Sequence, residues 1–310
     1  MPDDSPPDLS PEFASLLDAP LLEHLDLEVV KQYRAPLPGL GSTERVERTD
    51  RTIEGDPPVE VRIHRPRSGS SHPRPCVLSI HGGGFIIGSF DMDDARFETW
   101  SGVLGVIGVS VNYRLAPESP YPGALQDCDR ALTWVHENAS DLGIDSSRIG
   151  VYGPSAGGGL AAALALMVRD RGEIRLGFQL LEAPMLDDRR TTQSSRLDGL
   201  VVWNREANEF AWQCYLGDIF GEPDVPAYAA PARATELSGL PPSFISVGGA
   251  DGFRDEDIEY ALRLSRAGVP TELHVYPGAP HGYQMFVEST AAQQGARDAG
   301  EWLARVVAPS

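Results

Sequence analysis

The fold of this chain is decided by one stretch, GVYGPSAGGG at residues 150–159, which precedes the apolar run from Leu160 to Val168. It predicts a short buried strand, a sharp turn rich in glycine, and then a helix. Ser155 lies at the tip of that turn, within the pattern Gly-x-Ser-x-Gly. In this pattern the glycines permit a turn in which a Cβ would collide with backbone, and the hydroxyl is exposed above a helix N-terminus. Because the chain has 32 glycines, the pattern needs support from the rest of the sequence.

Predicted strands and helices alternate along most of the chain. Residues 46–53 and 59–64 alternate apolar and polar side chains around a turn, which predicts an antiparallel hairpin. Continuous apolar runs, typical of strands buried on both faces, are at 76–80 and 106–111. Further strands are predicted at 148–152, 176–181, 243–247 and 272–276. Helices are predicted at 97–104, 123–138, 160–168, 255–267 and 290–307. This order predicts an α/β fold with a mostly parallel central sheet flanked by helices.

The domain organisation predicted is a single α/β domain over residues 1–310 with a helical cap. Residues 188–235 lose the alternation of strand and helix, and about 1–40 carry helical periodicity between Pro11 and Tyr33. These two segments are expected to form the cap. Aromatic residues gather in the second segment and are expected to pack within the cap rather than line a binding site: Trp203, Phe210, Trp212, Tyr215 and Phe220.

The composition excludes several classes of function. A formal net charge of −19 argues against binding nucleic acid or an anionic membrane, because both need a basic face. The cysteines, at positions 76, 128 and 214, are too few and too scattered for a disulfide framework or a zinc site. The N-terminal residues are acidic and lack an apolar signal segment, and the longest apolar runs are too short to span a bilayer. We therefore expect a soluble, cytoplasmic protein.

A serine needs partners to act as a nucleophile near neutral pH. A histidine must take its proton, and a carboxylate must fix the tautomer of that histidine. Asp251 follows the predicted strand 243–247, and His281 follows the predicted strand 272–276. The glycine loop HGGGF at 81–85 follows another strand and could present backbone N–H groups to an oxyanion. All of them follow the carboxyl ends of predicted parallel strands, and the order Ser, Asp, His is that of α/β hydrolases.

Taken together, these motifs resemble one family, the hormone-sensitive-lipase-like esterases, which are the bacterial family IV carboxylesterases of the α/β-hydrolase fold. The resemblance rests on HGGG at 81–84, YRLAPE at 113–118, GPSAGG at 153–158, Asp251, and the His-Gly pair at 281–282. It covers nearly the whole chain and is strongest from about residue 76 to residue 285. The motifs depart from the family pattern at Pro154, where aspartate is usual, and at Gly252-Phe253.

The resemblance implies hydrolysis of small-molecule esters with short to medium acyl chains through an acyl-enzyme. It implies Ser155 as the nucleophile, His281 as the general base and acid, and Asp251 as the carboxylate that orients it. The oxyanion hole would consist of the backbone N–H groups of Gly83, Gly84 and Ala156. No metal or organic cofactor is implied, and we expect a monomer or a homodimer.

Other residues have competing interpretations. Asp255 and Asp257 are alternatives to Asp251, although Asp251 is nearest the strand end. His81 is expected to hold the glycine loop, and Glu118 to form a buried pair or backbone hydrogen bonds. The acidic stretch at 91–94 is interpreted as a solvated loop rather than a cation site. The remaining histidines lack metal-ligand spacing and are expected at the surface or in packing: His24, His64, His72, His136 and His274.

Alternative functions remain for the same motifs. A non-catalytic binder of small molecules is one, since plant gibberellin receptors resemble this fold, although their triad histidine is replaced. Amidases, lactonases and deacetylases use the same serine turn, and some plant relatives are dehydratases. Labelling by a fluorophosphonate separates an enzyme with an activated serine from a binder.

Overall fold

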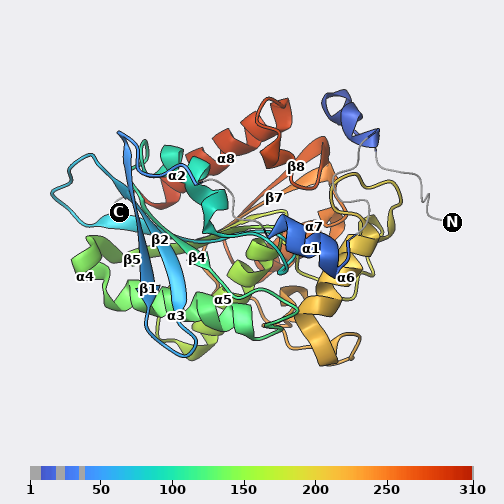
Figure 1. The fold of residues 1–310 in the computed structure, drawn as a ribbon, viewed down its shortest axis with the longest axis horizontal. Helices are drawn as coiled ribbons and strands as arrows, with labels where there is room; N and C mark the ends of the chain where they lie inside the picture. The colour runs from blue at the N-terminus through green and yellow to red at the C-terminus, as the bar shows by residue number, and fades with distance from the viewer. Residues whose placement is uncertain (1–7, 19–24, 35–38, 309–310) are drawn as a thin grey trace.

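The computed structural model describes residues 8–18, 25–34 and 39–308. Its centre is an eight-stranded sheet in the order β1-β2-β4-β3-β5-β6-β7-β8 (Figure 1). The pairs β1–β2 and β2–β4 are antiparallel, and every other pair is parallel. The strands are β1 Val46–Ile53, β2 Val59–Pro66, β3 Arg74–Ile80, β4 Ile107–Asn112, β5 Ile144–Pro154, β6 Gln179–Glu182, β7 Ser243–Ala250 and β8 Thr271–Pro280.

Helices cover both faces of this sheet. In Figure 1, α2 (Asp94–Trp100) and α8 (Thr290–Val306) lie on one side, and α3 (Gly123–Glu137), α4 (Ala139–Leu142) and α5 (Ala156–Arg171) lie on the other. Along β3, Val77 belongs to the core beneath α2 and α8, whereas Cys76 and Leu78 belong to the core beneath α3 and α5. Successive side chains of a strand point to opposite faces, so a strand covered on both sides is apolar throughout.

The predicted α/β fold is confirmed, including the antiparallel hairpin and the parallel strands that follow it. One helix lies earlier than predicted: α2 ends at Trp100, and residues 101–104 form a turn instead of the predicted helix. The glycines at 102 and 105 weaken a helix there, and Gly105 has a φ of +74°. The short helix α4 was not predicted; it ends at Gly143, which adopts the left-handed conformation.

The two segments predicted to form the cap contain short helices. The first holds a 3₁₀-helix, Pro11–Leu17, and α1, Leu27–Tyr33, while residues 21 and 22 of the predicted periodicity lie outside the described residues. The second holds α6, Arg205–Leu216, among loops and short 3₁₀ turns. Figure 1 draws α1 and α6 at the same end of the molecule. The cap and the single domain stay predictions.

Candidate active site

Ser155 lies between the end of β5 and the first residue of α5. Its φ of 55° and ψ of −125° are a strained conformation for a residue with a Cβ. The backbone N–H of Ser155 donates to the carbonyl of Glu182 at 2.8 Å, which ties the turn to β6. A Cβ at Gly157 would overlap the carbonyl oxygen of Ile80, so only glycine fits between the turn and β3. Pro154 pairs in register with Glu182, and its ring does not interrupt the turn.

His281 lies between the other two polar side chains of the predicted site. Its Nε2 is 2.9 Å from Ser155 Oγ, and its Nδ1 is 2.8 Å from Asp251 Oδ2. Since a carboxylate only accepts hydrogen bonds, Nδ1 carries the proton and Nε2 is free to accept from the serine hydroxyl. The other oxygen of Asp251 accepts the backbone N–H of Phe253 at 2.9 Å. Asp251 and His281 are both buried.

The structure separates Asp251 from its two competitors. Asp255 accepts the backbone N–H of Ser194 at 2.7 Å and pairs with Arg254. Asp257 is buried, and neither of its carboxylate oxygens has a partner among the described residues. Only Asp251 of the three is hydrogen-bonded to His281.

The glycine loop lies against Ser155. A Cβ at Gly82 would come within 3.4 Å of the Ser155 Cβ, and Gly83 and Gly84 have φ angles of 111° and 60°. The loop is closed by hydrogen bonds from the backbone N–H groups of residues 86 and 87 to the Gly83 carbonyl, each at 3.0 Å. Ala156, the third predicted donor, is the first residue of α5, where backbone N–H groups lack helical partners.

His81 holds this loop, as the sequence predicted. Its ring stacks on Tyr113 at 4.1 Å, and its Nδ1 donates to the carbonyl of Gly82 at 2.8 Å. The Tyr113 hydroxyl in turn donates to the His81 carbonyl at 2.9 Å. Burial lowers the pKa of His81 to about 4, so the ring is neutral near neutral pH. It therefore acts as a fixed donor to the backbone.

Arg34, which the sequence analysis missed, fastens the glycine loop from outside. Its guanidinium donates to the carbonyls of Ile86 at 2.7 Å and Ala116 at 2.6 Å, and it pairs with Glu118 at 2.8 Å. Glu118 was predicted to form a buried pair. The pair exists, but it is not buried, since 66% of the Glu118 side chain is exposed. No sequence motif points to Arg34, because its contacts are with backbone atoms more than 50 positions away.

The acidic stretch at 91–94 is not a solvated loop. Asp93 and Asp94 are buried. Arg62 of β2 pairs with Asp91 at 2.6 Å and with Asp94 at 3.2 Å, so these two carboxylates have an arginine partner from the hairpin. The prediction was wrong because it took no account of that hairpin. Over the part of the chain that the structure describes, no group of three or more His, Cys, Asp or Glu side chains could hold a metal ion.

A second unpredicted group lies beneath the serine turn. Glu182 ends β6 and is buried, and its carboxylate pairs with Arg96 at 2.8 Å and accepts the Tyr152 hydroxyl at 2.9 Å. The guanidinium of Arg96 lies over the rings of Trp100 and Tyr152. Because the Glu182 carbonyl holds the Ser155 N–H, this network supports the nucleophile position. A lone glutamate at the end of an apolar strand was its sequence signal.

The aromatic residues of the second cap segment mostly pack, as predicted. Trp212 and Tyr215 of α6 are fully buried. Both lie on Phe85 of the glycine loop, with ring centroids 5.5 Å and 3.9 Å away respectively. Helix α6 therefore covers the loop that carries two of the predicted oxyanion donors.

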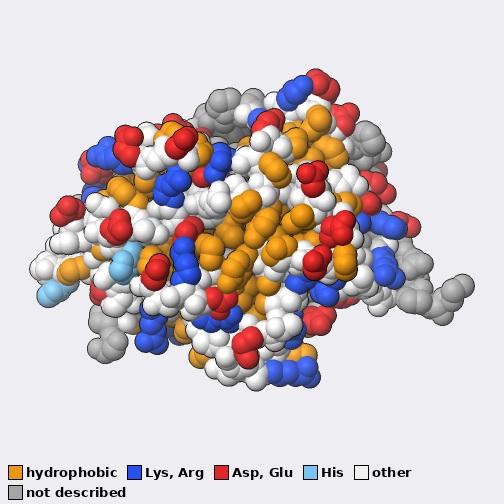
Figure 2. Space-filling model, turned by 90° about the horizontal axis from the view of Figure 1, so that it is seen from below, with side chains coloured by type: hydrophobic (Ala, Val, Ile, Leu, Met, Phe, Trp, Pro, Cys, Tyr) orange, Lys and Arg blue, Asp and Glu red, His pale blue; other side chains and the backbone are white. Residues whose placement is uncertain are grey.

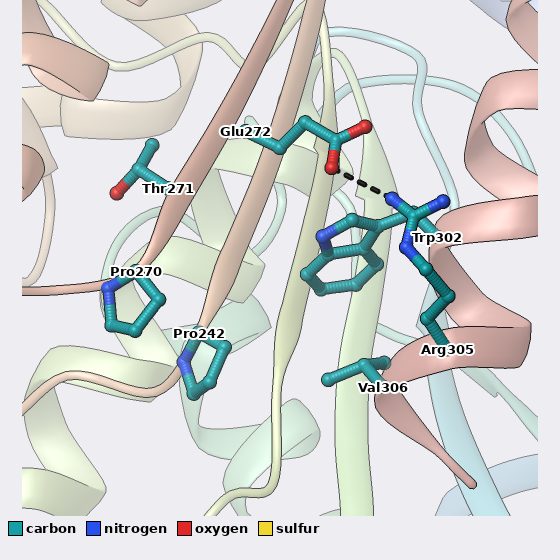
Figure 3. A pocket seen from close by; sticks show the side chains of 7 residues that line it. All are labelled: Pro242, Pro270, Thr271, Glu272, Trp302, Arg305 and Val306. Carbon is teal, nitrogen blue, oxygen red and sulfur yellow. Dashed lines mark hydrogen bonds and ion pairs between the residues drawn. The ribbon is translucent and has the colours of Figure 1, made fainter.

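Two cavities lie away from Ser155. One of about 300 Å³ lies where β7 and β8 begin, at the edge of the sheet opposite Ser155, and is lined by residues that include Pro242, Pro270 and Trp302 (Figure 3). Another, of about 510 Å³, lies between residues 120–122 and 216–226.

Figure 2 views the side on which α3 lies in Figure 1, and hydrophobic side chains gather across its middle. In the described ranges no helix is long and apolar enough to cross a membrane.

Comparisons with known proteins show the family of this chain. A family model described as the alpha/beta hydrolase fold matches residues 77–285. Esterase LipI of Mycobacterium tuberculosis is 36% identical over 311 residues, which cover 98% of this chain and 97% of that protein. Carboxylesterase NlhH of the same species is 37% identical over 90% of each chain. The solved structure of a bacterial heroin esterase is 39% identical and has a TM-score of 0.88 over 97% of this chain and 99% of its own.

The chain therefore belongs to the α/β hydrolase family. Within it, the resemblance to the hormone-sensitive-lipase-like esterases is confirmed, and the protein is an enzyme of the carboxylic ester hydrolase class.

The pH dependence of the free energy of unfolding tests the state of the buried carboxyl group of Asp257. Burial, with Glu256 and Asp251 nearby, raises the pKa of Asp257 well above its ordinary value. A carboxyl whose pKa is raised by folding stabilises the protein below the pKa of the unfolded chain and loses that contribution as pH rises. We expect Asp257→Asn to unfold at the same urea concentration as the wild type near pH 4. At pH 8 its free energy of unfolding should be higher by at least about 1 kcal/mol.

The matched control is Glu259→Gln, which changes an exposed carboxylate of α7 (Arg254–Arg266). Its free energy of unfolding should stay within about 0.5 kcal/mol of the wild type at every pH. An Asp257→Asn protein that is less stable than the wild type at pH 8 would show that Asp257 is charged and paired.

Proposed function

We propose that the protein hydrolyses small-molecule carboxylic esters with short to medium acyl chains, using Ser155, His281 and Asp251 as a catalytic triad. The observation that carries this proposal is the position of His281, whose two ring nitrogens lie 2.9 Å from Ser155 Oγ and 2.8 Å from Asp251 Oδ2. In such a chain the histidine can take the serine proton while the carboxylate stabilises the resulting imidazolium.

The first half of the reaction forms an acyl-enzyme. Ser155 Oγ attacks the ester carbonyl carbon, and His281 Nε2 takes the hydroxyl proton. The carbonyl oxygen becomes an oxyanion that accepts hydrogen bonds from the backbone N–H groups of Gly83, Gly84 and Ala156. One donor of this kind typically contributes about 3 kcal/mol to the transition state. The bond to the alcohol oxygen then breaks, and His281 gives that oxygen the proton, which releases the alcohol.

The second half regenerates the serine. Water occupies the place of the alcohol, His281 Nε2 takes a proton from it, and its oxygen attacks the acyl carbon. The same backbone donors bind the second oxyanion. When the bond between Ser155 Oγ and the acyl carbon breaks, His281 returns the proton to Ser155 and the carboxylic acid leaves. Every proton transfer goes through His281, so no metal or organic cofactor is needed for this sequence.

The test of this proposal is covalent labelling by a fluorophosphonate, followed by mass spectrometry of the peptides. We expect one label per chain, on Ser155, and none on Ser155→Ala. The control Ser146→Ala, an exposed serine at the far end of β5, should be labelled like the wild type. A folded wild-type protein that stays unlabelled would favour the alternative of a small-molecule binder without an activated nucleophile. A label at another serine would show that Ser155 is not the nucleophile.

A series of p-nitrophenyl esters from acetate to dodecanoate addresses the acyl preference, with a maximum of kcat/KM expected at short to medium chains. Amide, lactone and acetylated-sugar substrates in the same assay compare the amidase, lactonase and deacetylase alternatives. The cytoplasmic location and the monomeric or dimeric state stay predictions.

A further inference from the structure

Residues 200–203, which precede α6, lie beside three glycines of the candidate site. A Cβ at Gly252 would come within 3.0 Å of Leu200 Cδ1, and one at Gly282 within 3.8 Å of Val202 Cγ1. These glycines directly follow Asp251 and His281 in the sequence. The segment therefore contacts the backbone beside two members of the triad.

The last residue of this segment, Trp203, reaches the third part of the site. A Cβ at Gly84 would overlap the far edge of the Trp203 ring and would lie 2.8 Å from its Cζ2. The Trp203 ring is also near His281, with 6.3 Å between ring centroids and 43° between ring planes. Its side chain is buried, and the indole Nε1 has no hydrogen-bond partner among the described residues. The indole thus lies between the glycine loop and the histidine.

This position has a consequence for the ester that the site accepts. The oxygen of the departing alcohol must come within hydrogen-bond distance of His281 Nε2, because that nitrogen supplies its proton. The carbonyl oxygen must lie at the glycine loop. A rigid ring that contacts the loop at Gly84 and lies beside His281 therefore borders the side of the site where the alcohol portion leaves. A bulky side chain that borders a binding site excludes larger groups by steric overlap.

We propose that Trp203 determines specificity by limiting the size of the alcohol portion of the ester. This inference rests on the proposed function. Small alcohol groups fit beside the indole, and branched or bicyclic ones meet it. Because the acyl chain extends from the other side of the carbonyl carbon, the preference for acyl length does not depend on Trp203.

The experiment compares Trp203→Ala with the wild type on two ester series. The first varies the alcohol at constant acyl group, with ethyl, phenyl, cyclohexyl and 1-naphthyl acetates, and acid release is followed in a pH-stat. The second varies the acyl group at constant alcohol, with p-nitrophenyl acetate, butyrate and hexanoate. We expect the ratio of kcat/KM for 1-naphthyl over ethyl acetate to rise at least about tenfold in the variant. The hexanoate-to-acetate ratio should change less than about twofold.

Two further variants make the result specific. Trp203→Phe keeps an aromatic ring of smaller size and should fall between the wild type and Trp203→Ala; it also serves as the test if the alanine variant does not fold. Phe220→Ala removes another aromatic side chain of the same cap segment, one that packs under Arg190, and should leave both ratios unchanged.

Two outcomes would overturn the assignment. If the acyl ratio shifts and the alcohol ratio does not, Trp203 borders the acyl side. If both ratios stay within twofold of the wild type, Trp203 does not select substrates. Failure of the proposed function itself is distinguishable, because the wild type would then neither react with a fluorophosphonate at Ser155 nor hydrolyse any ester of either series.

Discussion

Ser155→Ala is expected to lower kcat for p-nitrophenyl butyrate by about 10⁶-fold while leaving the fold intact. Removing the nucleophile of a Ser-His-Asp triad typically has an effect of about this size. The structural basis is the hydrogen bond of 2.9 Å between Ser155 Oγ and His281 Nε2, which has no replacement when the hydroxyl is removed. Removing a small hydroxyl from a half-buried position leaves the glycine turn and its backbone contacts in place.

The combination with His281→Ala makes this prediction more stringent. When two residues act as one catalytic unit, removing either of them removes the contribution of both to the rate. The double variant should therefore be about as slow as Ser155→Ala alone. Steady-state rates of both variants, with far-UV circular dichroism to verify folding, provide the measurement. If Ser155→Ala retained wild-type turnover, or if the losses of the two single variants multiplied in the double variant, the triad would not be the catalytic unit.

Arg96→Met is expected to lower the free energy of unfolding by about 3–5 kcal/mol, the usual effect of removing one partner from a buried ion pair. Only 1% of the Glu182 side chain is exposed, and Arg96 Nη2 is 2.8 Å from its Oε2. Without the guanidinium, the carboxylate keeps the Tyr152 hydroxyl but loses its counter-charge in a place that water does not reach. Urea denaturation at pH 7 measures the change.

The matched control removes both charges. Arg96→Met combined with Glu182→Gln leaves no buried charge, and its free energy of unfolding should recover a large part of the loss. Turnover provides a second measurement. The Glu182 carbonyl accepts the Ser155 N–H at 2.8 Å, so the position of the nucleophile depends on Glu182. An Arg96→Met protein within about 1 kcal/mol of the wild type would mean that the pair does not stabilise the fold.

A feature of the site could be predicted when neighbouring residues in the sequence determine it. The serine turn was predictable because a bend of this sharpness requires glycine on both sides of the nucleophile. His81 was predictable as a structural residue because it opens the glycine loop. The acidic stretch at 91–94 was not: its own sequence is that of a solvated loop, and the arginine that pairs with Asp91 and Asp94 comes from β2, about 30 positions earlier.

The sequence by itself determined the α/β fold, the mostly parallel sheet that begins with an antiparallel hairpin, and the residues that follow the carboxyl ends of the strands. The reason is that a strand buried on both faces requires apolar residues and a tight turn requires glycine. Both requirements can be recognised within a single short segment of sequence. Only the tertiary structure decided which carboxylate meets His281, that Arg34 fastens the glycine loop, that Arg96 neutralises Glu182, and that Trp203 lies near the glycine loop and His281. Those contacts join side chains from distant elements, and their directions are set by packing across the sheet and the cap rather than by any local pattern.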